Sequence, residues 1–306
     1  MSGTAYLNTH GDARLVATSD CPNLLLKVTS MAPQNLPARL WRYQAERFPL
    51  GQHGLLIAAF ASSGVSLAAL LYSQITVPPL ATFGMAFGVL FSSFLLLRIA
   101  DEFKDAATDA QYRPQRPVPR GLVSLRELAG VGGVMLGLQL LLVLAYDPSL
   151  LGLLGLLWGY LYLMQKEFYC AAWLHAHPLA YMLSHMLIMP LLDLFATACV
   201  WWPQQPPPGL AGFLALSFSN GLLIELGRKT WAPSQEQPGV ESYSSAWGLR
   251  PALGIWLAAL ASAWALAFLT ATLIDFTLPV LGGLSVLALF MGYTAQQLAS
   301  LPTPAA

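Results

Sequence analysis

The stretch LATFGMAFGVLFSSFLLLRIADEFKDAATD, residues 80–109, joins an apolar run to a concentration of charge. An apolar run of about 20 residues is long enough to cross a bilayer as a helix. Asp101, Asp105 and Asp109 follow at intervals that place them on one face if the helix continues. The stretch therefore predicts a transmembrane helix that ends in a row of carboxylates.

The composition of the whole chain extends this prediction. Of its 306 residues, 56% are hydrophobic and only 10% are charged, and the mean hydropathy is +0.57. Soluble domains carry about 25% charged residues. Apolar windows of span length occur at about 54–73, 80–100, 127–146, 148–165, 176–198, 209–227, 250–273 and 276–299. We predict an all-α polytopic membrane protein with eight transmembrane helices.

The first 36 residues differ from the rest, because they contain no apolar run long enough for a span or a signal peptide. We expect residues 1–36 to be a flexible cytosolic tail and residues 37–306 to form the transmembrane domain. Residues 37–54 mix aromatic side chains with arginines, which suits either a short interfacial helix or an ordinary lead-in to the first span. Cys21, Cys170 and Cys199 are too scattered for a disulfide framework or a zinc site.

The basic residues predict the topology. With eight spans, all 15 Lys and Arg fall on one face or at the helix ends that border it. Basic residues favour the cytoplasmic side, which places there the N-terminus and the loops 101–126, 166–175 and 228–249. We expect an integral, multi-pass protein of a bacterial inner membrane. Its partner is then the lipid bilayer, and we expect it to bind no nucleic acid.

The aspartate run has the composition of a diphosphate site. Carboxylate oxygens are ligands for Mg²⁺, which fills its other positions with water and substrate phosphates. The segment YRPQRPVPRG then supplies Arg113, Arg116 and Arg120, which suit fork-like pairing with phosphate oxygens. The alternative is a solvated helix end in which Arg98 and Lys104 neutralise the acids.

A second polar cluster lies in SNGLLIELGRKTWAPSQEQPGVESYSSAWG, residues 219–248. Glu225 lies at the end of an apolar span, and Lys229 follows it by one helical turn. An ionisable residue at membrane depth indicates function. Because both charged helix ends reach the same face of the membrane, we predict that they form the two halves of one site. The alternative is that the two helix ends carry charge independently and form no common site.

The two segments together resemble a known family. DEFKDAATD with RPQRPVPRGLVS is similar to the first aspartate-rich motif of the UbiA-type intramembrane prenyltransferases, N-x-x-x-D-x-x-x-D followed by RP…G.IS. GVESYSSAWG resembles the segment after their second motif. The resemblance covers residues 37–299. It implies a helical bundle, usually of nine spans, around a central cavity in which Mg²⁺ holds an isoprenoid diphosphate.

The resemblance also implies roles for particular residues. Asp101 stands where the family usually has Asn, and the second motif, D-x-x-x-D in the family, falls on Glu225 and Lys229. A protonated lysine cannot bind Mg²⁺ but can contact diphosphate directly. The expected metal ligands, which are also catalytic, are Asp101, Asp105, Asp109 and Glu225. The expected diphosphate-binding residues are Arg113, Arg116, Arg120, Lys166, Arg228 and Lys229, the last also catalytic.

The fourth and fifth spans add candidates. Lys166 ends the fourth span near the expected diphosphate, followed by Glu167. Within the fifth span, Asp193 is a catalytic candidate that would steer an acceptor, accept a proton or stabilise a cation. For His185 an interhelical hydrogen bond is the plainer role. Pro190 predicts a kink between them.

Three functions fit these features. The resemblance favours a Mg²⁺-dependent prenyltransferase that transfers the prenyl group of an isoprenoid diphosphate to a small aromatic or other lipophilic acceptor. The altered second motif keeps open a UbiA-type terpene cyclase, which needs no acceptor. The third is a non-enzymatic transporter, but its charge should lie at the membrane midplane, whereas here it lies at one edge.

Overall fold

The structure, a computed structural model, describes residues 35–72, 77–236 and 239–300. In these ranges the chain is built from helices without strands, and eight of its helical segments are long and apolar enough to cross a membrane. These segments are α2 (Leu50–Leu71), α3 (Leu80–Lys104), α5 (Leu125–Tyr146), η1 with α6 (Pro148–Leu150 and Leu151–Gln165), α8 with α9 (Pro178–Met186 and Ile188–Trp201), α10 (Leu210–Lys229), α12 (Leu249–Thr272) and α13 (Thr277–Ala299). The prediction of an all-α polytopic membrane protein with eight spans is confirmed.

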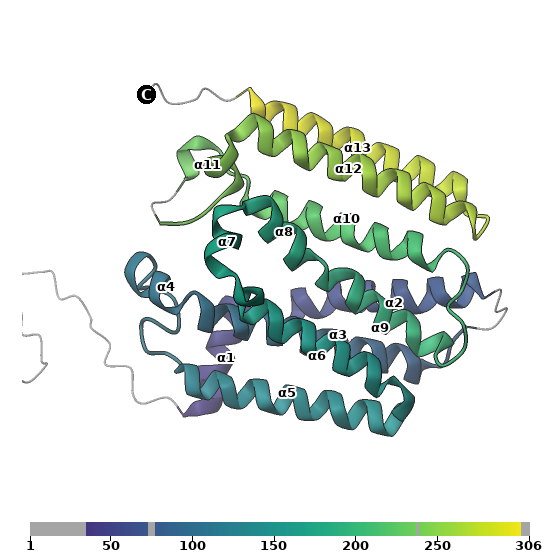
Figure 1. Cartoon of the computed structure of the whole chain (residues 1–306), viewed down its shortest axis with the longest axis horizontal. Helices are drawn as coiled ribbons and strands as arrows, with labels where there is room; N and C mark the ends of the chain where they lie inside the picture. The colour runs from purple at the N-terminus through teal and green to yellow at the C-terminus, as the bar shows by residue number, and fades with distance from the viewer. Residues whose placement is uncertain (1–34, 73–76, 237–238, 301–306) are drawn as a thin grey trace, which may run out of the picture.

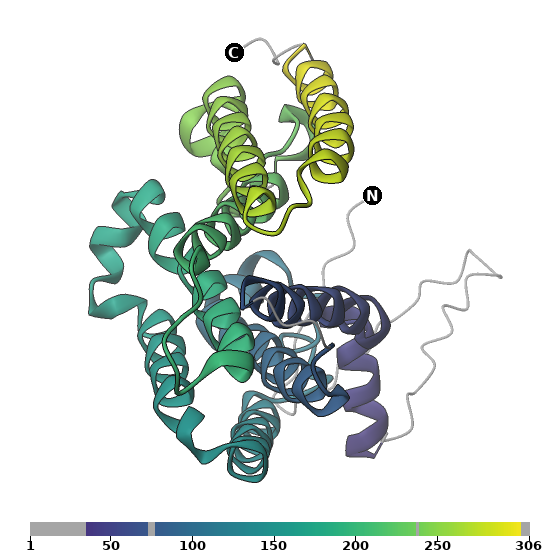
Figure 2. The ribbon, with the colours of Figure 1, turned by 90° about the vertical axis from the view of Figure 1, so that its right-hand side faces the viewer.

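Helix α3 lies at the centre of the bundle, in contact with α2, α5, α6 and α9. Helix α10 packs on α9 and on α12, and α12 pairs with α13 at one side of the molecule (Figures 1 and 2). Small residues permit close helix contacts in membranes. At Gly64 of α2, a Cβ would lie 3.2 Å from the Cβ of Ala196 on α9. This close contact brings α2 against α9 beside the central helix.

A buried amide also joins the central helices. Gln139 of α5 is fully buried; its Nε2 donates to Ser93 Oγ of α3 at 2.8 Å, and its Oε1 accepts from Trp158 Nε1 of α6 at 2.7 Å. Interhelical hydrogen bonds of this kind contribute about 0.6 kcal/mol on average in a membrane. They fix the rotation of three helices about one another.

The fifth span is broken between α8 and α9 at Leu187, three residues before the proline that predicted a kink. Pro190 has no N–H to donate to the carbonyl of Met186, so the helical ladder is interrupted one turn earlier. The predicted kink is confirmed, and its position follows from the missing donor.

The short helices gather at one end of the bundle, which we call the charged end (Figure 1). They are α1 (Leu36–Arg47), α4 (Ala106–Tyr112), α7 (Ala171–Ala176) and α11 (Tyr243–Trp247), together with the turns η2 (Glu167–Tyr169) and η3 (Pro233–Gln235). Most of the predicted N-terminal tail, residues 1–34, lies outside the described residues.

Helix α1 is docked onto the bundle. Three ion pairs hold it: Arg39 with Glu127 at 2.5 Å, Arg47 with Glu102 at 2.5 Å, and Glu46 with Arg120 at 2.6 Å. Its Tyr43 is only 3% exposed and packs against Ile99 at the end of α3. Of the two interpretations of this segment, neither anticipated that α1 would support the charged end of α3.

Candidate functional site

The three aspartates do not lie on one continuous helix. Helix α3 extends to Lys104, the chain bends at Asp105, and α4 begins at Ala106. Asp101 therefore belongs to α3, Asp105 to the bend and Asp109 to α4. The bend separates their environments: the side chain of Asp101 is 46% exposed, whereas that of Asp109 is 2% exposed.

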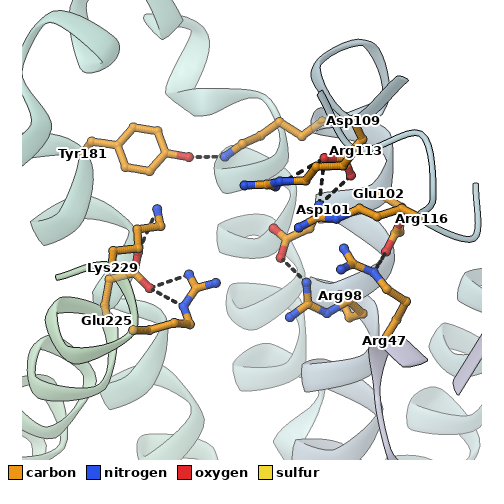
Figure 3. Close-up of polar contacts among 12 residues, drawn as sticks. Arg47, Arg98, Asp101, Glu102, Asp109, Arg113, Arg116, Tyr181, Glu225 and Lys229 are labelled. Atoms are coloured by element: carbon orange, nitrogen blue, oxygen red, sulfur yellow. Dashed lines mark hydrogen bonds and ion pairs between the residues drawn. The ribbon is translucent and has the colours of Figure 1, made fainter. Parts of the chain in front are cut away.

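Asp109 is held by the arginines that follow it. Arg116 Nη1 donates to both of its carboxylate oxygens, at 2.8 and 2.6 Å, and Arg113 Nη1 lies 3.3 Å from Oδ1 (Figure 3). Arg120 is 2.6 Å from Glu46 of α1. A buried carboxylate needs such partners, because an unpaired charge at this depth is costly. In this structure the three arginines expected at the diphosphate bind protein carboxylates.

The other two aspartates are less engaged. Asp101 Oδ2 lies 3.3 Å from Arg98 Nη1, an ion pair within one turn of α3. Asp105 is half-buried and has no ion pair with any described residue. Between them, Lys104 turns toward Glu167, 3.3 Å away, and donates to the hydroxyl of Tyr181.

The end of α10 forms the second half of the cluster. Glu225 is 7% exposed and lies 2.6 Å from Arg228 Nη2 and 2.9 Å from Lys229 Nζ. The Tyr243 hydroxyl of α11 donates to the same carboxylate at 3.5 Å. Burial raises the pKa of the Tyr243 phenol well above its ordinary value, and the nearby Glu225 charge adds to the shift. The phenol therefore stays a hydrogen-bond donor.

Tyr181 of α8 connects the two halves. Lys104 Nζ lies 4.8 Å from the centre of its ring, and Lys229 Nζ lies 5.8 Å from it. Figure 3 shows Glu225 and Lys229 facing Asp101 and Arg98 from the opposite side of the site. A lysine ammonium is attracted to an aromatic face at such distances. The ends of the two motif-bearing helices therefore both contact Tyr181, a residue that no sequence signal had singled out.

The turn between α6 and α7 also contributes to the cluster. Glu167, Phe168 and Tyr169 have φ of 47°, 51° and 58°, a conformation that non-glycine residues rarely adopt. The turn directs Glu167 inward, where it lies 3.3 Å from Lys104 and 3.1 Å from His175. Lys166 remains exposed, 6.0 Å from the ring centre of Tyr162. The structure therefore brings Glu167 to the cluster in the place expected for Lys166.

Asp193 lies apart from this cluster. It is 1% exposed in α9, and its Oδ1 lies 3.2 Å from where a Cβ of Gly64 would be. It follows His185 by eight residues, which is about 12 Å along a helix. Its catalytic role stays a prediction, as does its relation to an acceptor.

The carboxylates only partly suit a metal ion. The described residues hold no group of three or more His, Cys, Asp or Glu that could bind one. Asp109 and Glu225 are each bound by two cationic side chains, so their metal roles stay predictions. Asp101 and Asp105 are one turn apart, and Mg²⁺ commonly binds through one or two carboxylates together with substrate phosphates. The metal role of this pair also stays a prediction.

Comparison with known proteins supports the fold. No protein-family profile and no curated protein sequence matches the chain. A solved structure described as digeranylgeranylglyceryl phosphate synthase in membranes is similar, with a TM-score of 0.53 and 16% identity over 86% of this chain and 95% of that one. The similarity supports the predicted all-α bundle of membrane-spanning helices.

Proposed function

We propose that this chain is a UbiA-type membrane prenyltransferase, which takes an isoprenoid diphosphate as donor and transfers its prenyl group to a lipophilic, aromatic acceptor. The observation that carries the proposal is the approach of both Lys104 and Lys229 to Tyr181, with their Nζ atoms 4.8 and 5.8 Å from its ring centre. It joins the ends of the two motif-bearing helices at one end of an apolar bundle. The fold shared with a prenyl-transferring synthase supports the same conclusion.

The cationic side chains of this cluster suit a diphosphate. Lys104 is paired with Glu167, and Arg228 and Lys229 are both paired with Glu225. When a diphosphate binds, its oxygens would replace these carboxylates as partners of the three cations. Cations fixed in this way offset the charge that develops on the leaving diphosphate. The apolar bundle next to them excludes water from an allylic cation.

We propose that Asp101 and Asp105 hold Mg²⁺, whose chemistry is to neutralise diphosphate oxygens. Asp109 instead positions Arg113 and Arg116, and Glu225 positions Arg228 and Lys229. Chelation with EDTA should remove activity and added Mg²⁺ should restore it. Full activity in chelator would show that the two aspartates serve another purpose.

We further propose that the charged end faces the cytoplasm of a bacterial inner membrane. The basic residues concentrate at this end, which is the side they favour. Isoprenoid diphosphates are strongly charged and would reach the cluster from water while their chains enter the bundle.

The decisive experiment supplies purified protein with Mg²⁺ and geranyl, farnesyl or geranylgeranyl diphosphate, with and without a panel of phenols and naphthols. Prenylated acceptor, detected by mass spectrometry, would support the proposal. Cyclic hydrocarbons or alcohols formed without acceptor would favour the cyclase, to which the Lys229 departure from the family motif points. If no isoprenoid diphosphate is consumed under any condition, both enzymatic functions are wrong.

A further inference from the structure

His185 lies directly beside the cluster but has no role in the proposed diphosphate site. Its ring stacks on Tyr181, with centroids 4.0 Å apart and planes at 10°, and meets the edge of Phe168 at 5.7 Å. The side chain is 7% exposed. Because α8 runs inward from the charged end, His185 lies four residues, about 6 Å, deeper in the bundle than Tyr181.

The hydrogen bonds of the ring determine its tautomer. His185 Nδ1 lies 2.8 Å from the carbonyl oxygen of Tyr181, and a carbonyl oxygen only accepts. Ser184 Oγ, 3.3 Å from Nδ1, donates its own hydrogen to the same carbonyl at 3.0 Å and so can only accept from Nδ1. Nδ1 therefore carries the hydrogen, which leaves the lone pair of the neutral imidazole on Nε2. Nε2 is buried and has no hydrogen-bond partner in the described part of the chain. The fold thus presents a neutral base in the interior.

We propose that His185 Nε2 is the catalytic base that accepts the proton lost by the acceptor, an inference that rests on the proposed function. When the prenyl C–O bond breaks, its electron pair leaves with the diphosphate. A π electron pair of the aromatic acceptor forms the new C–C bond. The C–H bond at that ring carbon then breaks, its electrons restore the aromatic ring, and the proton passes to Nε2.

The position of the ring suits this step. The reacting carbon is bonded to a diphosphate oxygen, so with the diphosphate between Lys104 and Lys229 the new bond forms just inside the charged end. That is the depth of His185. A positioned general base of this kind contributes about 10²–10⁴-fold to a rate.

The charged side chains that interact electrostatically with the His185 ring are Lys104, Glu167 and Lys229. The two lysines are donors when protonated. Glu167 already binds Lys104 and His175, at 3.3 and 3.1 Å. Among these described groups, His185 Nε2 is the buried polar atom that has no hydrogen-bond partner.

His185→Asn tests the proposal, because the asparagine amide can still donate to the Tyr181 carbonyl while no base remains. With farnesyl diphosphate and a phenol that the wild type accepts, kcat should fall by about 10²-fold or more, with the Michaelis constant for farnesyl diphosphate little changed. A phenol deuterated at the reacting carbon should show a larger primary isotope effect in the variant. Diphosphate should also be released in excess over prenylated product.

His177→Asn is the matched control. His177 Nδ1 makes the same contact with a carbonyl one turn earlier, that of Trp173 at 2.8 Å, but the ring is exposed. The His177→Asn variant should keep kcat and the isotope effect at wild-type values. If His185→Asn also leaves them there, His185 is not the base.

The wild type gives an independent measurement should His185→Asn fail to fold. A protonated imidazole cannot accept a proton, so lowering the pH should reduce kcat and enlarge the isotope effect together; an isotope effect independent of pH would overturn the proposal. A wild type that cyclises its donor without acceptor would also overturn it while leaving isoprenoid chemistry intact. A wild type that consumes no isoprenoid diphosphate would overturn the proposed function as well.

Discussion

Arg47 and Glu102 form a buried ion pair that ties α1 to the end of α3, with Arg47 Nε donating to Glu102 Oε1 at 2.5 Å. The side chain of Glu102 is 1% exposed and follows Asp101 directly in the chain. Arg47→Met would leave a buried carboxylate without its partner, which should cost about 3–5 kcal/mol of unfolding free energy. A thermal unfolding curve in detergent measures the loss.

The control for this prediction is Glu46→Gln, which neutralises the exposed pair between α1 and Arg120. Exposed pairs contribute about 0–1 kcal/mol. The double variant Arg47→Met with Glu102→Gln should recover most of the stability, because no buried charge remains. Equal losses from Arg47→Met and Glu46→Gln would show that the α1 contact is not buried in solution.

Hydropathy was sufficient to predict the spans, since each needs a long apolar run whatever its neighbours are. The predicted end of the second span at residue 100 was too early, because α3 continues to Lys104. A charged residue ends an apolar window but not a helix, and Glu102 is accommodated by a partner from α1. Hydropathy carries no information about such a partner.

The site was only partly predictable for a similar reason. Spacing identified the carboxylates, but it could not show that Asp109 would be enclosed by Arg113 and Arg116, since their approach depends on the bend at Asp105. Tyr181 reaches the cluster through contacts between helices far apart in sequence. No local pattern distinguishes it from other tyrosines of a membrane helix.

Asp105 and Asp109 should respond differently to substitution. Asp105→Ala should abolish turnover with little change in stability, because this side chain has no ion pair among the described residues and is proposed to bind the metal. Asp109→Ala should destabilise the protein, because it releases two arginines from a buried carboxylate. Activity and thermal unfolding measured on both variants separate the roles. Asp105→Ala activity above about a tenth of wild type would contradict the ligand role, whose loss should cost several kcal/mol.

Gly239 lies where the loop after α10 meets the first motif. Its φ is +72°, and an added Cβ would lie 2.5 Å from the ring of Tyr112 at the end of α4. Gly239→Ala should therefore cost more than the about 1–2 kcal/mol of a left-handed residue alone. Gly121→Ala is the control, with φ of +76° and no atom within 4 Å. Thermal unfolding measures the loss of stability in each variant. Equal losses in the two variants would mean that the loop does not contact Tyr112.

The topology can be tested without any activity. Reporter fusions after residues 110 and 235 should report a cytoplasmic position, and fusions near 147 and 204 should report the opposite side, because the basic residues lie toward the first pair. An external signal at 110 would reverse the orientation and place the cluster away from cytosolic diphosphates.

Lys229 is the clearest departure from the second motif of the UbiA-type enzymes that the chain resembles, and its role can be separated from that of its neighbour. It lies 2.9 Å from Glu225 and 5.8 Å from the Tyr181 ring centre, on the side facing α3. If its ammonium contacts diphosphate, Lys229→Ala should lose about 1.5–3 kcal/mol of binding, the scale of a charged hydrogen bond. The Michaelis constant for the donor would then rise roughly tenfold to a hundredfold, while the magnesium requirement persists.

If Lys229 only pairs with Glu225, its loss should leave the donor's Michaelis constant at the wild-type value, because Arg228 still binds that buried carboxylate. Arg228→Ala is the comparison, because Arg228 binds the same carboxylate but is 57% exposed. Lys229→Asp restores the family pattern and should retain activity with a steeper dependence on Mg²⁺. The donor's Michaelis constant, measured for all three variants at several Mg²⁺ concentrations, separates these roles. A Michaelis constant and a kcat that both equal the wild-type values throughout would remove Lys229 from the diphosphate site, because a contact to the leaving group cannot be lost without weakening donor binding or slowing its departure.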